Sequence, residues 1–265
     1  MDLGLLIIGD EILSGRREDK HFAKVRELLA ARGLQLAWVR YVGDDRPRIE
    51  SVLRETFAGK DIVFCCGGIG ATPDDHTRQA AAAALDVPIV LHPEAAELIT
   101  ERCAEMAREG RGSADMSLPE NRQRLRMGEF PEGARIVPNP FNRIPGFSVG
   151  SHWFMPGFPV MAWPMIEWIL DTHYRELFFE RSTALLAFMA RGLPESVVTP
   201  ALEAVEAAFT QVKVFCLPSA GTIQRPGHLE LGVKGDPESV EAACRMLREA
   251  VLLLGGEIDE LPSAG

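Results

Sequence analysis

The sequence predicts an α/β protein in which a three-layer domain, with a mostly parallel sheet between helices on both faces, precedes a small ferredoxin-like α+β domain. Two observations carry this prediction. From residue 3 to residue 85, apolar runs alternate with helical patterns, which is the order of elements in a parallel sheet with crossover helices. Beyond about residue 180, the order changes to strand, helix, strand, strand and helix. We therefore expect one domain at residues 1–175 and a second at residues 180–257.

The first domain begins with three pairs of a strand and a helix. Residues 3–8 and 61–66 are continuous apolar runs of the kind buried in a parallel sheet, and residues 34–42 alternate as a half-buried strand does. Apolar side chains at helical spacing, or a run of alanines, predict the helices at residues 21–31, 48–57 and 78–85. In such sheets ligands bind at the carboxyl ends of the strands, so the loops there are the expected place for a site.

The later elements are less regular. Residues 88–129 read as polar and helical, and a run rich in proline, glycine and asparagine follows at residues 138–147. A short strand at 152–155, a second rigid turn and a helix at 160–170 complete the first domain. The second domain has predicted strands at residues 183–190, 212–217 and 228–233 and predicted helices at 195–209 and 237–254. It holds no acidic cluster and no glycine-rich loop, which favours a role in packing, dimerisation or covering a site.

Composition excludes some classes of function. The chain has 265 residues and a formal net charge of −10, so a broad basic face for nucleic acid is not expected. No run approaches the roughly 18 apolar residues that a membrane-spanning helix needs, and we expect no membrane association. The five cysteines fit neither a disulfide framework nor a zinc site, which indicates reduced thiols in a cytoplasmic protein.

A glycine-rich loop after the third strand supplies the most specific local signal. Gly67, Gly68 and Gly70 let the backbone approach a ligand closely and point amide groups at an anion such as a phosphate. The structural alternative is a capped helix start, with Thr72 as N-cap and Pro73 in the first turn. The loop alone does not decide between these two interpretations.

Acidic residues occur in pairs after three strands. The pairs are Asp10 with Glu11, Asp44 with Asp45, and Asp74 with Asp75. Carboxylates gathered at one sheet edge repel one another unless a cation or the donors of a ligand lie between them. Mg²⁺ and Mn²⁺ prefer such oxygen ligands. A phosphate cradle beside metal-binding carboxylates therefore predicts a site for nucleotide or pyrophosphate chemistry. Ser14, close by in the sequence, either binds a phosphate oxygen or caps its own turn.

These motifs, in this order, resemble the MoaB/Mog-type molybdopterin-binding fold, and most of all the N-terminal module of CinA-like (competence/damage-inducible) proteins. The matching segments are GDEILSG at residues 9–15, VGDD at 42–45, GGIGATPDDHT at 67–77, NPFNRIPGF at 139–147 and MPGFP at 155–159. The resemblance covers residues 3 to about 170, and the second domain resembles the small domain that follows in those proteins. The deamidase module of full-length CinA is not expected within the 265 residues, so its amide hydrolysis is not carried over.

The resemblance implies a function and a set of site residues. Members of the molybdenum-cofactor branch bind molybdopterin, and CinA-like or related modules hydrolyse ADP-ribose or FAD with a divalent metal such as Mg, Mn or Co. By this carry-over the chain is a metal-dependent nucleotide pyrophosphatase and forms a homo-oligomer, a dimer or a trimer. Asp44, Asp74 and Asp75 would bind the metal and act in catalysis. The substrate would contact Asp10, Glu11, Ser14, Gly67, Gly68, Gly70, Thr72, Thr77, Asn121, Pro156 and Gly157.

The sequence departs from the pattern of that family at several positions. Met161 stands where the family carries Glu, and Trp163 stands where Lys is common. Lesser departures are at Lys20, His21, Ala71, Asn142 and Arg143. The loss of a polar residue at position 161 favours a second hypothesis, in which the chain binds a pterin or nucleotide without chemistry. The fold is compatible with both.

Overall fold

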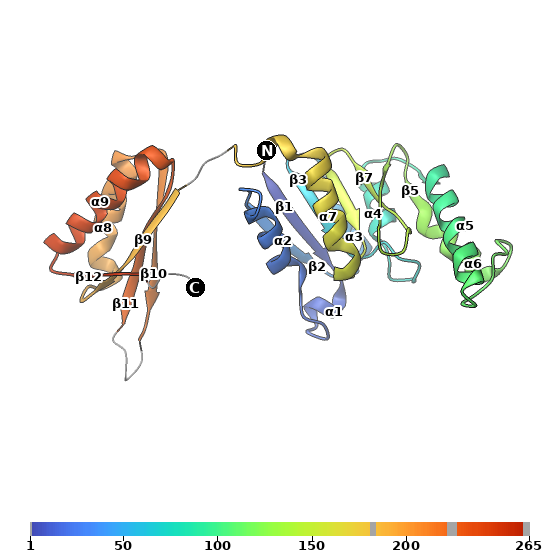
Figure 1. Cartoon of the computed structure of the whole chain (residues 1–265), viewed down its shortest axis with the longest axis horizontal. Coiled ribbons are helices and arrows are strands. Elements are labelled where there is room, and N and C mark those ends of the chain that lie inside the picture. Colours follow the sequence, from blue (N-terminus) through green and yellow to red (C-terminus); the bar gives the residue numbers. More distant parts are fainter. Residues whose placement is uncertain (1, 181–183, 222–226, 262–265) are drawn as a thin grey trace. The chain divides into compact units, whose positions relative to one another are not determined.

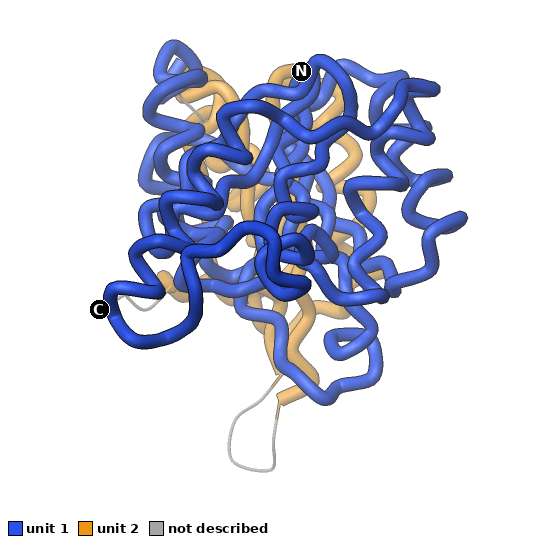
Figure 2. The backbone as a smooth tube through the Cα atoms, turned by 90° about the vertical axis from the view of Figure 1, so that its right-hand side faces the viewer, with its two compact units in different colours: residues 1–180 blue, residues 181–265 orange. Residues whose placement is uncertain are grey.

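The computed structural model describes residues 2–180, 184–221 and 227–261. The chain divides into two compact units, Met1–Glu180 and Arg181–Gly265 (Figure 2). The first unit contains a six-stranded sheet in the order β2-β1-β3-β8-β7-β6 (Figure 1). Strands β2, β1, β3 and β8 run parallel, and β7 and β6 continue the sheet antiparallel. The strands span Leu3–Ile8 (β1), Trp38–Val42 (β2), Ile62–Cys66 (β3), Arg135–Val137 (β6), Gly146–Val149 (β7) and His152–Met155 (β8).

Helices cover both faces of this sheet, which confirms the predicted three layers (Figure 1). All six residues of β1 are buried, and successive side chains enter opposite cores: Leu5 packs with α2 and α7, whereas Leu6 packs with α3 and α4. A continuous apolar run is therefore what a central strand with two covered faces requires. The helical segments span His21–Ala30 (α2), Arg46–Phe57 (α3), Thr77–Ala84 (α4), Pro159–His173 (α7) and Arg175–Leu177 (η2).

The segment at residues 88–129 is helical for much of its length, as predicted, but it also contains strands that the sequence prediction did not include. Two short strands pair antiparallel at its ends and enclose the helices. These elements span Ile89–Leu91 (β4), Pro93–Arg108 (α5), Pro119–Leu125 (α6), Arg126–Gly128 (η1) and Glu129–Pro131 (β5). Strands of three residues are too short to show an alternating pattern. Phe130 of β5 is fully buried and stacks on Phe147 of the main sheet at 4.8 Å between ring centroids, which joins this segment to the core.

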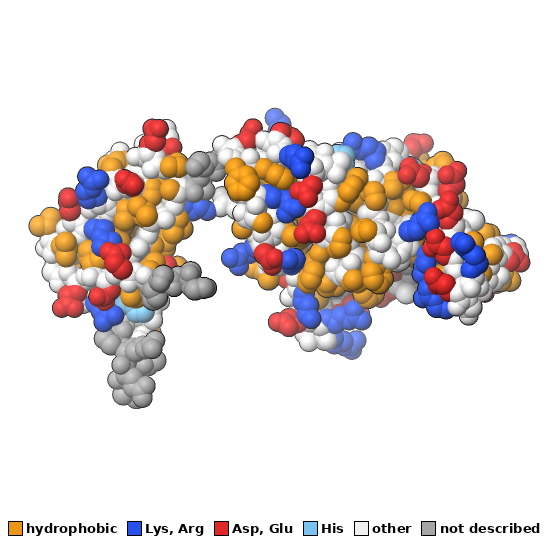
Figure 3. Space-filling model, viewed as in Figure 1, with side chains coloured by type: hydrophobic (Ala, Val, Ile, Leu, Met, Phe, Trp, Pro, Cys, Tyr) orange, Lys and Arg blue, Asp and Glu red, His pale blue; other side chains and the backbone are white. Residues whose placement is uncertain are grey.

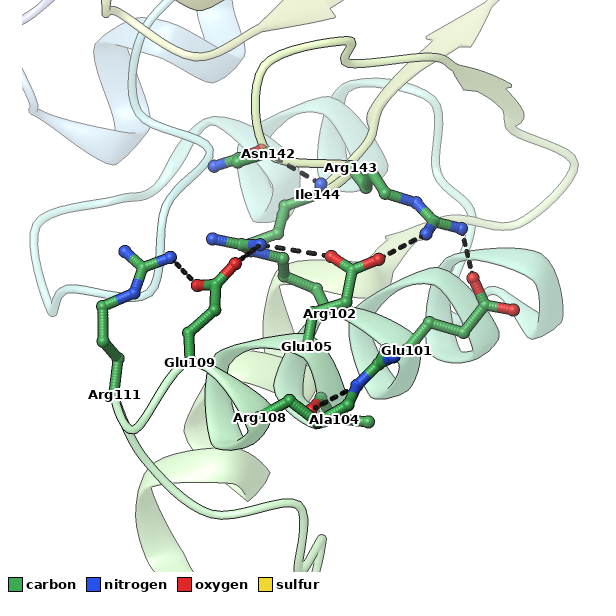
Figure 4. Close-up of polar contacts among 10 residues, drawn as sticks. All are labelled: Glu101, Arg102, Ala104, Glu105, Arg108, Glu109, Arg111, Asn142, Arg143 and Ile144. Carbon is green, nitrogen blue, oxygen red and sulfur yellow. Dashed lines mark hydrogen bonds and ion pairs between the residues drawn. The ribbon is translucent and has the colours of Figure 1, made fainter.

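Ion pairs join α5 to the loop before β7 (Figure 4). Arg143 has a φ of 64°, in the left-handed region, and its guanidinium pairs with Glu105 at 2.7 Å and with Glu101. In Figure 3, acidic and basic side chains lie side by side over α5 and α6. The two signs of charge therefore offset each other on this face.

The second unit has the strand order of a ferredoxin-like fold. Its sheet is ordered β10-β11-β9-β12 with antiparallel neighbours, and α8 and α9 pack on one face of it. The elements span Ala184–Arg191 (β9), Glu195–Ala208 (α8), Val212–Ser219 (β10), His228–Gly235 (β11), Pro237–Leu253 (α9) and Glu257–Glu260 (β12). The prediction omitted β12, whose residues are mostly acidic and exposed. Residue 183, the predicted start of the first strand, lies outside the described residues.

No helix in the described part of the chain has the length and apolar character needed to cross a membrane. All five cysteines are free thiols. Burial in the central sheet raises the pKa of Cys66 to about 12, so this thiol stays protonated and unreactive.

Candidate functional site

The loops at the carboxyl ends of β1, β2, β3 and β8 enclose a cavity of about 430 Å³. This is the sheet edge where the sequence predicts a ligand site. The predicted site residues that line the cavity are Glu11, Asp44, Gly67, Gly68, Gly70, Thr72, Asp74, Asp75, Pro156 and Gly157. The fold thus brings the glycine-rich loop, members of all three acidic pairs and the rigid turn after β8 to one place.

The glycine-rich loop begins with two residues that no other amino acid can replace without strain. Gly67 has a φ of 113° and Gly68 a φ of 69°, both in the left-handed region. A Cβ at Gly67 would overlap the carbonyl oxygen of Ile8, and a Cβ at Gly68 would overlap the hydroxyl of Thr77. Thr77 donates that hydroxyl to the carbonyl of Gly67 at 3.0 Å. The turn is therefore held tightly against the end of β1.

The first two acidic loops are joined through Asp10 and Asp44. The amide of Asp10 donates to Asp44 Oδ2 at 2.8 Å, so the Asp44 carboxylate is fixed at the cavity wall. Burial raises the pKa of Asp44, and the negative charges of Asp10, Glu11 and Asp74 raise it further. Negative charges from all three acidic loops therefore act on the Asp44 carboxylate. A cation in the cavity would relieve this repulsion.

The third acidic loop is organised by Thr72. Asp75 Oδ2 accepts from the Thr72 amide at 2.9 Å and from the Thr72 hydroxyl at 2.5 Å. The following helix begins only at Thr77, so Thr72 does not cap it as the structural alternative supposed. The Thr72 side chain also lowers the pKa of Asp74, which keeps this exposed carboxylate ionised. The loop therefore holds its carboxylates at the cavity.

Carbonyl groups on the outer side of the glycine-rich loop are bonded to side chains that the sequence prediction did not include. Arg78 is only 3% exposed and donates to the Gly70 carbonyl at 2.6 Å, and Gln123 of α6 donates to the Ala71 carbonyl at 2.5 Å. Burial lowers the pKa of the Arg78 guanidinium. These contacts fix the orientation of the loop. Their sequence signal was weak, because an arginine and a glutamine on helices usually face solvent.

Four predicted residues lie outside the cavity wall, and three of them are bonded to residues that line it. Asp10 is bonded to Asp44, and Thr77 to Gly67. The Ser14 hydroxyl donates to the Glu11 carbonyl at 3.4 Å, a contact within its own turn. Asn121 is fully buried and donates to the carbonyl groups of the loop between α5 and α6.

Seven residues absent from the prediction also line the cavity, and two of them have large side chains that contact each other. Arg17 and Phe158 line the cavity, and the Arg17 guanidinium lies 5.9 Å from the centroid of the Phe158 ring. His21, which the prediction placed only near the site, is buried and its Nε2 lies 3.0 Å from the Gly157 carbonyl. It fixes the turn that carries Phe158. Met161 and Trp163 are not in the wall, and Met161 instead contacts Asn142.

The donor set fits a hard cation that also takes ligands from a substrate. Within residues 2–180, 184–221 and 227–261, no three His, Cys, Asp or Glu side chains form a ready-made metal site. The cavity instead offers carboxylates from Glu11, Asp44 and Asp74 on separate loops. Mg²⁺ is commonly bound by one or two carboxylates together with water and substrate phosphates, and this arrangement fits that pattern.

Comparison with known proteins agrees with this architecture. Residues 4–175 match the family model described as a probable molybdopterin binding domain. A CinA-like protein of Anaeromyxobacter dehalogenans is 31% identical over 275 residues, covering 99% of this chain and 63% of that protein. A CinA-like protein of another Anaeromyxobacter species is 32% identical over 206 residues, covering 76% of this chain and 47% of that protein. The chain thus spans only part of the length of these relatives.

A solved structure supports the fold. The crystal structure of the protein CinA, of unknown function, from Thermoplasma acidophilum aligns with a TM-score of 0.54 and 24% identity. The alignment covers 64% of this chain and 98% of that one. Together with the family model, it confirms the resemblance that the sequence motifs indicated. The chain belongs to the family of probable molybdopterin binding domains and is similar to CinA-like proteins.

Proposed function

We propose that this protein is a metal-dependent nucleotide pyrophosphatase that hydrolyses ADP-ribose or an FAD-like dinucleotide to two monophosphates. One observation carries the proposal: a glycine-rich loop and carboxylates from three loops line the same cavity. Backbone amides suit phosphate oxygens, and carboxylates suit the cation that accompanies a pyrophosphate. A purely structural role for the glycine-rich loop would not require carboxylates beside it, nor would a structural role for the carboxylates require the loop.

Each part of the cavity has a role in this proposal. The amides of Gly68 and Gly70 bind the diphosphate, whereas the Gly67 amide donates to the Met155 carbonyl at 2.9 Å and Gly67 only shapes the turn. Asp44 and Asp74 hold the divalent cation, and Asp75 joins them through Oδ1 while its Oδ2 holds Thr72. When bound, the cation supplies charge neutralisation at the phosphoryl oxygens and activation of water. Water attacks phosphorus, the bridging P–O bond breaks, and each product keeps one phosphate.

The second candidate is a binding module that holds a pterin or nucleotide without chemistry. The description of the matching family as probable molybdopterin binding favours it. It differs from the first candidate in one measurable respect, because it predicts saturable binding of the ligand without product.

The test is a product assay with matched variants. The protein is incubated with ADP-ribose, FAD or NAD, with and without Mg²⁺, Mn²⁺ or Co²⁺, and AMP is measured by chromatography. We expect metal-dependent AMP that falls about 100-fold or more in Asp74→Asn. Asp259→Asn, which removes the same charge from β12 of the second unit, serves as the control and keeps full activity.

Three results would overturn the assignment. They are equal turnover with and without metal, unchanged turnover in Asp74→Asn, and no AMP from any combination of substrate and metal. Saturable binding of molybdopterin or a nucleotide in the last case would establish the second candidate.

A further inference from the structure

Phe158 is a large apolar side chain in an unusual position. It lines the cavity of the candidate site and is 53% exposed. It follows Gly157, whose position packs against Gly67: a Cβ at Gly157 would lie 3.4 Å from the Gly67 Cα. The ring therefore lies beside the glycine-rich loop, where the proposed function places the phosphates.

The backbone that carries this ring is fixed although the ring is exposed. The Phe158 carbonyl accepts from the amides of Met161 and Ala162, each at 2.9 Å, because Phe158 is the N-cap residue of α7. On the other side, buried His21 contacts the Gly157 carbonyl. Ligand binding therefore does not have to order the backbone at this position.

Arg17 gives the ring a polar neighbour. Its guanidinium lies 5.9 Å from the Phe158 centroid, and its amide donates to the Glu11 carbonyl at 3.0 Å. The Arg17 backbone is thus tied to the turn that supplies a cavity carboxylate. An exposed aromatic ring beside a guanidinium is a surface on which planar aromatic groups stack.

We propose that Phe158 forms a stacking subsite for the planar aromatic group of the ligand, which is a purine base, a pterin or an isoalloxazine ring. This inference rests on the proposed function for the position of the phosphates. It deepens that proposal by requiring an aromatic group beside the diphosphate. The Phe158 ring stacks on the aromatic group, and the glycine-rich loop binds the phosphate.

A binding experiment tests this subsite separately from catalysis. Affinities for AMP, FMN and inorganic pyrophosphate, each with Mg²⁺, are measured by calorimetry on the full chain. AMP is a product of the proposed reaction, so its binding requires no turnover. The variants are Phe158→Ala, Phe158→Trp and Phe141→Ala, the last being the matched control. Phe141 is 57% exposed and lies in the loop before β7, outside the cavity wall.

We expect Phe158→Ala to weaken AMP and FMN binding about tenfold, because stacking on an aromatic side chain contributes that much per base. Pyrophosphate affinity stays unchanged, Phe158→Trp keeps the AMP affinity, and Phe141→Ala changes neither affinity. Metal-dependent AMP production in the wild type is measured separately. Its failure would remove the proposed reaction while leaving the stacking result intact.

Several outcomes would overturn the subsite. Unchanged AMP affinity in Phe158→Ala would do so, as would equal losses for AMP and pyrophosphate, which would indicate damage to the glycine-rich loop. Failure of the wild type to bind either AMP or FMN would also contradict it. If Phe158→Ala leaves AMP affinity unchanged but lowers the sedimentation coefficient, the ring instead contacts a second copy of the chain.

Discussion

Asp10 and Asp44 exchange hydrogen bonds: the amide of each donates to the carboxylate of the other, at 2.8 and 3.1 Å. The two residues come from different loops, after β1 and after β2, which are adjacent parallel strands. The exchange fixes two carboxylates at short range and leaves their charges uncompensated by any ion pair in the described residues. In the folded state the two amide donors partly offset the repulsion between the carboxylates. A bound cation would offset the remainder.

The raised pKa of Asp44 predicts a specific pH dependence of metal binding. Metal affinity falls as the pH drops through this pKa, because protonated Asp44 cannot bind a cation. Glu11→Gln removes one of the charges that raise the pKa, so the midpoint of the acid limb moves to lower pH. Mn²⁺ binding followed by electron paramagnetic resonance from pH 7 downward measures it. Glu203→Gln, in α8, leaves the midpoint in place, and a Glu11→Gln midpoint equal to the wild type would contradict the electrostatic coupling.

Two glycines with positive φ differ both in backbone conformation and in what a side chain at each position would meet. Gly110, with a φ of 71°, has open space around its Cβ position, whereas a Cβ at Gly67 would overlap the Ile8 carbonyl. We expect Gly110→Ala to lower the free energy of unfolding by about 1 kcal/mol and to keep AMP binding. Gly67→Ala is expected to lower the free energy of unfolding by about 3 kcal/mol and to abolish AMP binding. Urea unfolding measures the stability of the two variants, and calorimetry measures their AMP binding. Equal losses of stability at the two positions would contradict this prediction.

His152 predicts a loss of stability in weak acid. Burial lowers its pKa to about 4, while its Nε2 lies 2.9 Å from the Thr56 hydroxyl. The unfolded state then binds a proton near pH 6.5 and the folded state does not, so stability decreases as the pH falls from about 6.5 to about 4. At pH 5 the loss relative to pH 7 is about 2 kcal/mol.

Urea unfolding of the wild type and His152→Gln at pH 7 and pH 5 measures this effect. The variant keeps a polar partner for Thr56 and removes the titration. The free energy of unfolding should therefore change less between pH 7 and pH 5 in the variant, by the amount that His152 contributes. The same pH dependence in both proteins would assign the acid sensitivity to other groups.

Arg143 combines backbone strain with surface ion pairs. Its left-handed φ of 64° is unfavourable for any residue other than glycine, and its guanidinium pairs with Glu101 and Glu105 (Figure 4). Both variants lose the ion pairs, which contribute little because they are exposed. The variants therefore differ mainly in backbone strain, and Arg143→Gly is expected to be more stable than Arg143→Ala by about 1 kcal/mol. Thermal unfolding of the two variants makes the comparison. A higher melting temperature for Arg143→Ala would show that the backbone is relaxed at this position.

Much of the fold follows from the sequence because its central strands are buried on both faces. The sequence predicts Leu3–Ile8 with the bounds observed, since a short, uninterrupted apolar run that stops at a glycine and two acidic residues is typical of a buried strand. The strands that escaped prediction lack such a pattern. Ile89–Leu91, Glu129–Pro131 and Arg135–Val137 have three residues each, Gly146–Val149 begins inside the run rich in proline and glycine, and Glu257–Glu260 is mostly acidic. Their pairing depends on partners distant in the sequence, which local pattern does not encode.

The candidate site was predictable where chemistry and spacing coincide. Glycines and acidic residues directly after strands must meet at one edge of a parallel sheet, and they do. The sequence analysis missed Arg17, Phe158 and Arg78. Their placement at the site depends on the course of a loop or the orientation of a helix, which residue type does not reveal. An arginine or phenylalanine outside a motif has many possible positions in a fold.

The most direct test of the central claim is hydrolysis of ADP-ribose with Mg²⁺ in oxygen-18-labelled water, followed by mass spectrometry of the products. The proposed reaction predicts AMP and ribose 5-phosphate in equal amounts, with one labelled oxygen per cleavage located on a phosphate. It also predicts that removal of the metal by a chelator stops the incorporation. Monophosphates without label, or no monophosphates while ADP-ribose still binds, would contradict it and leave a binding module as the function of this site.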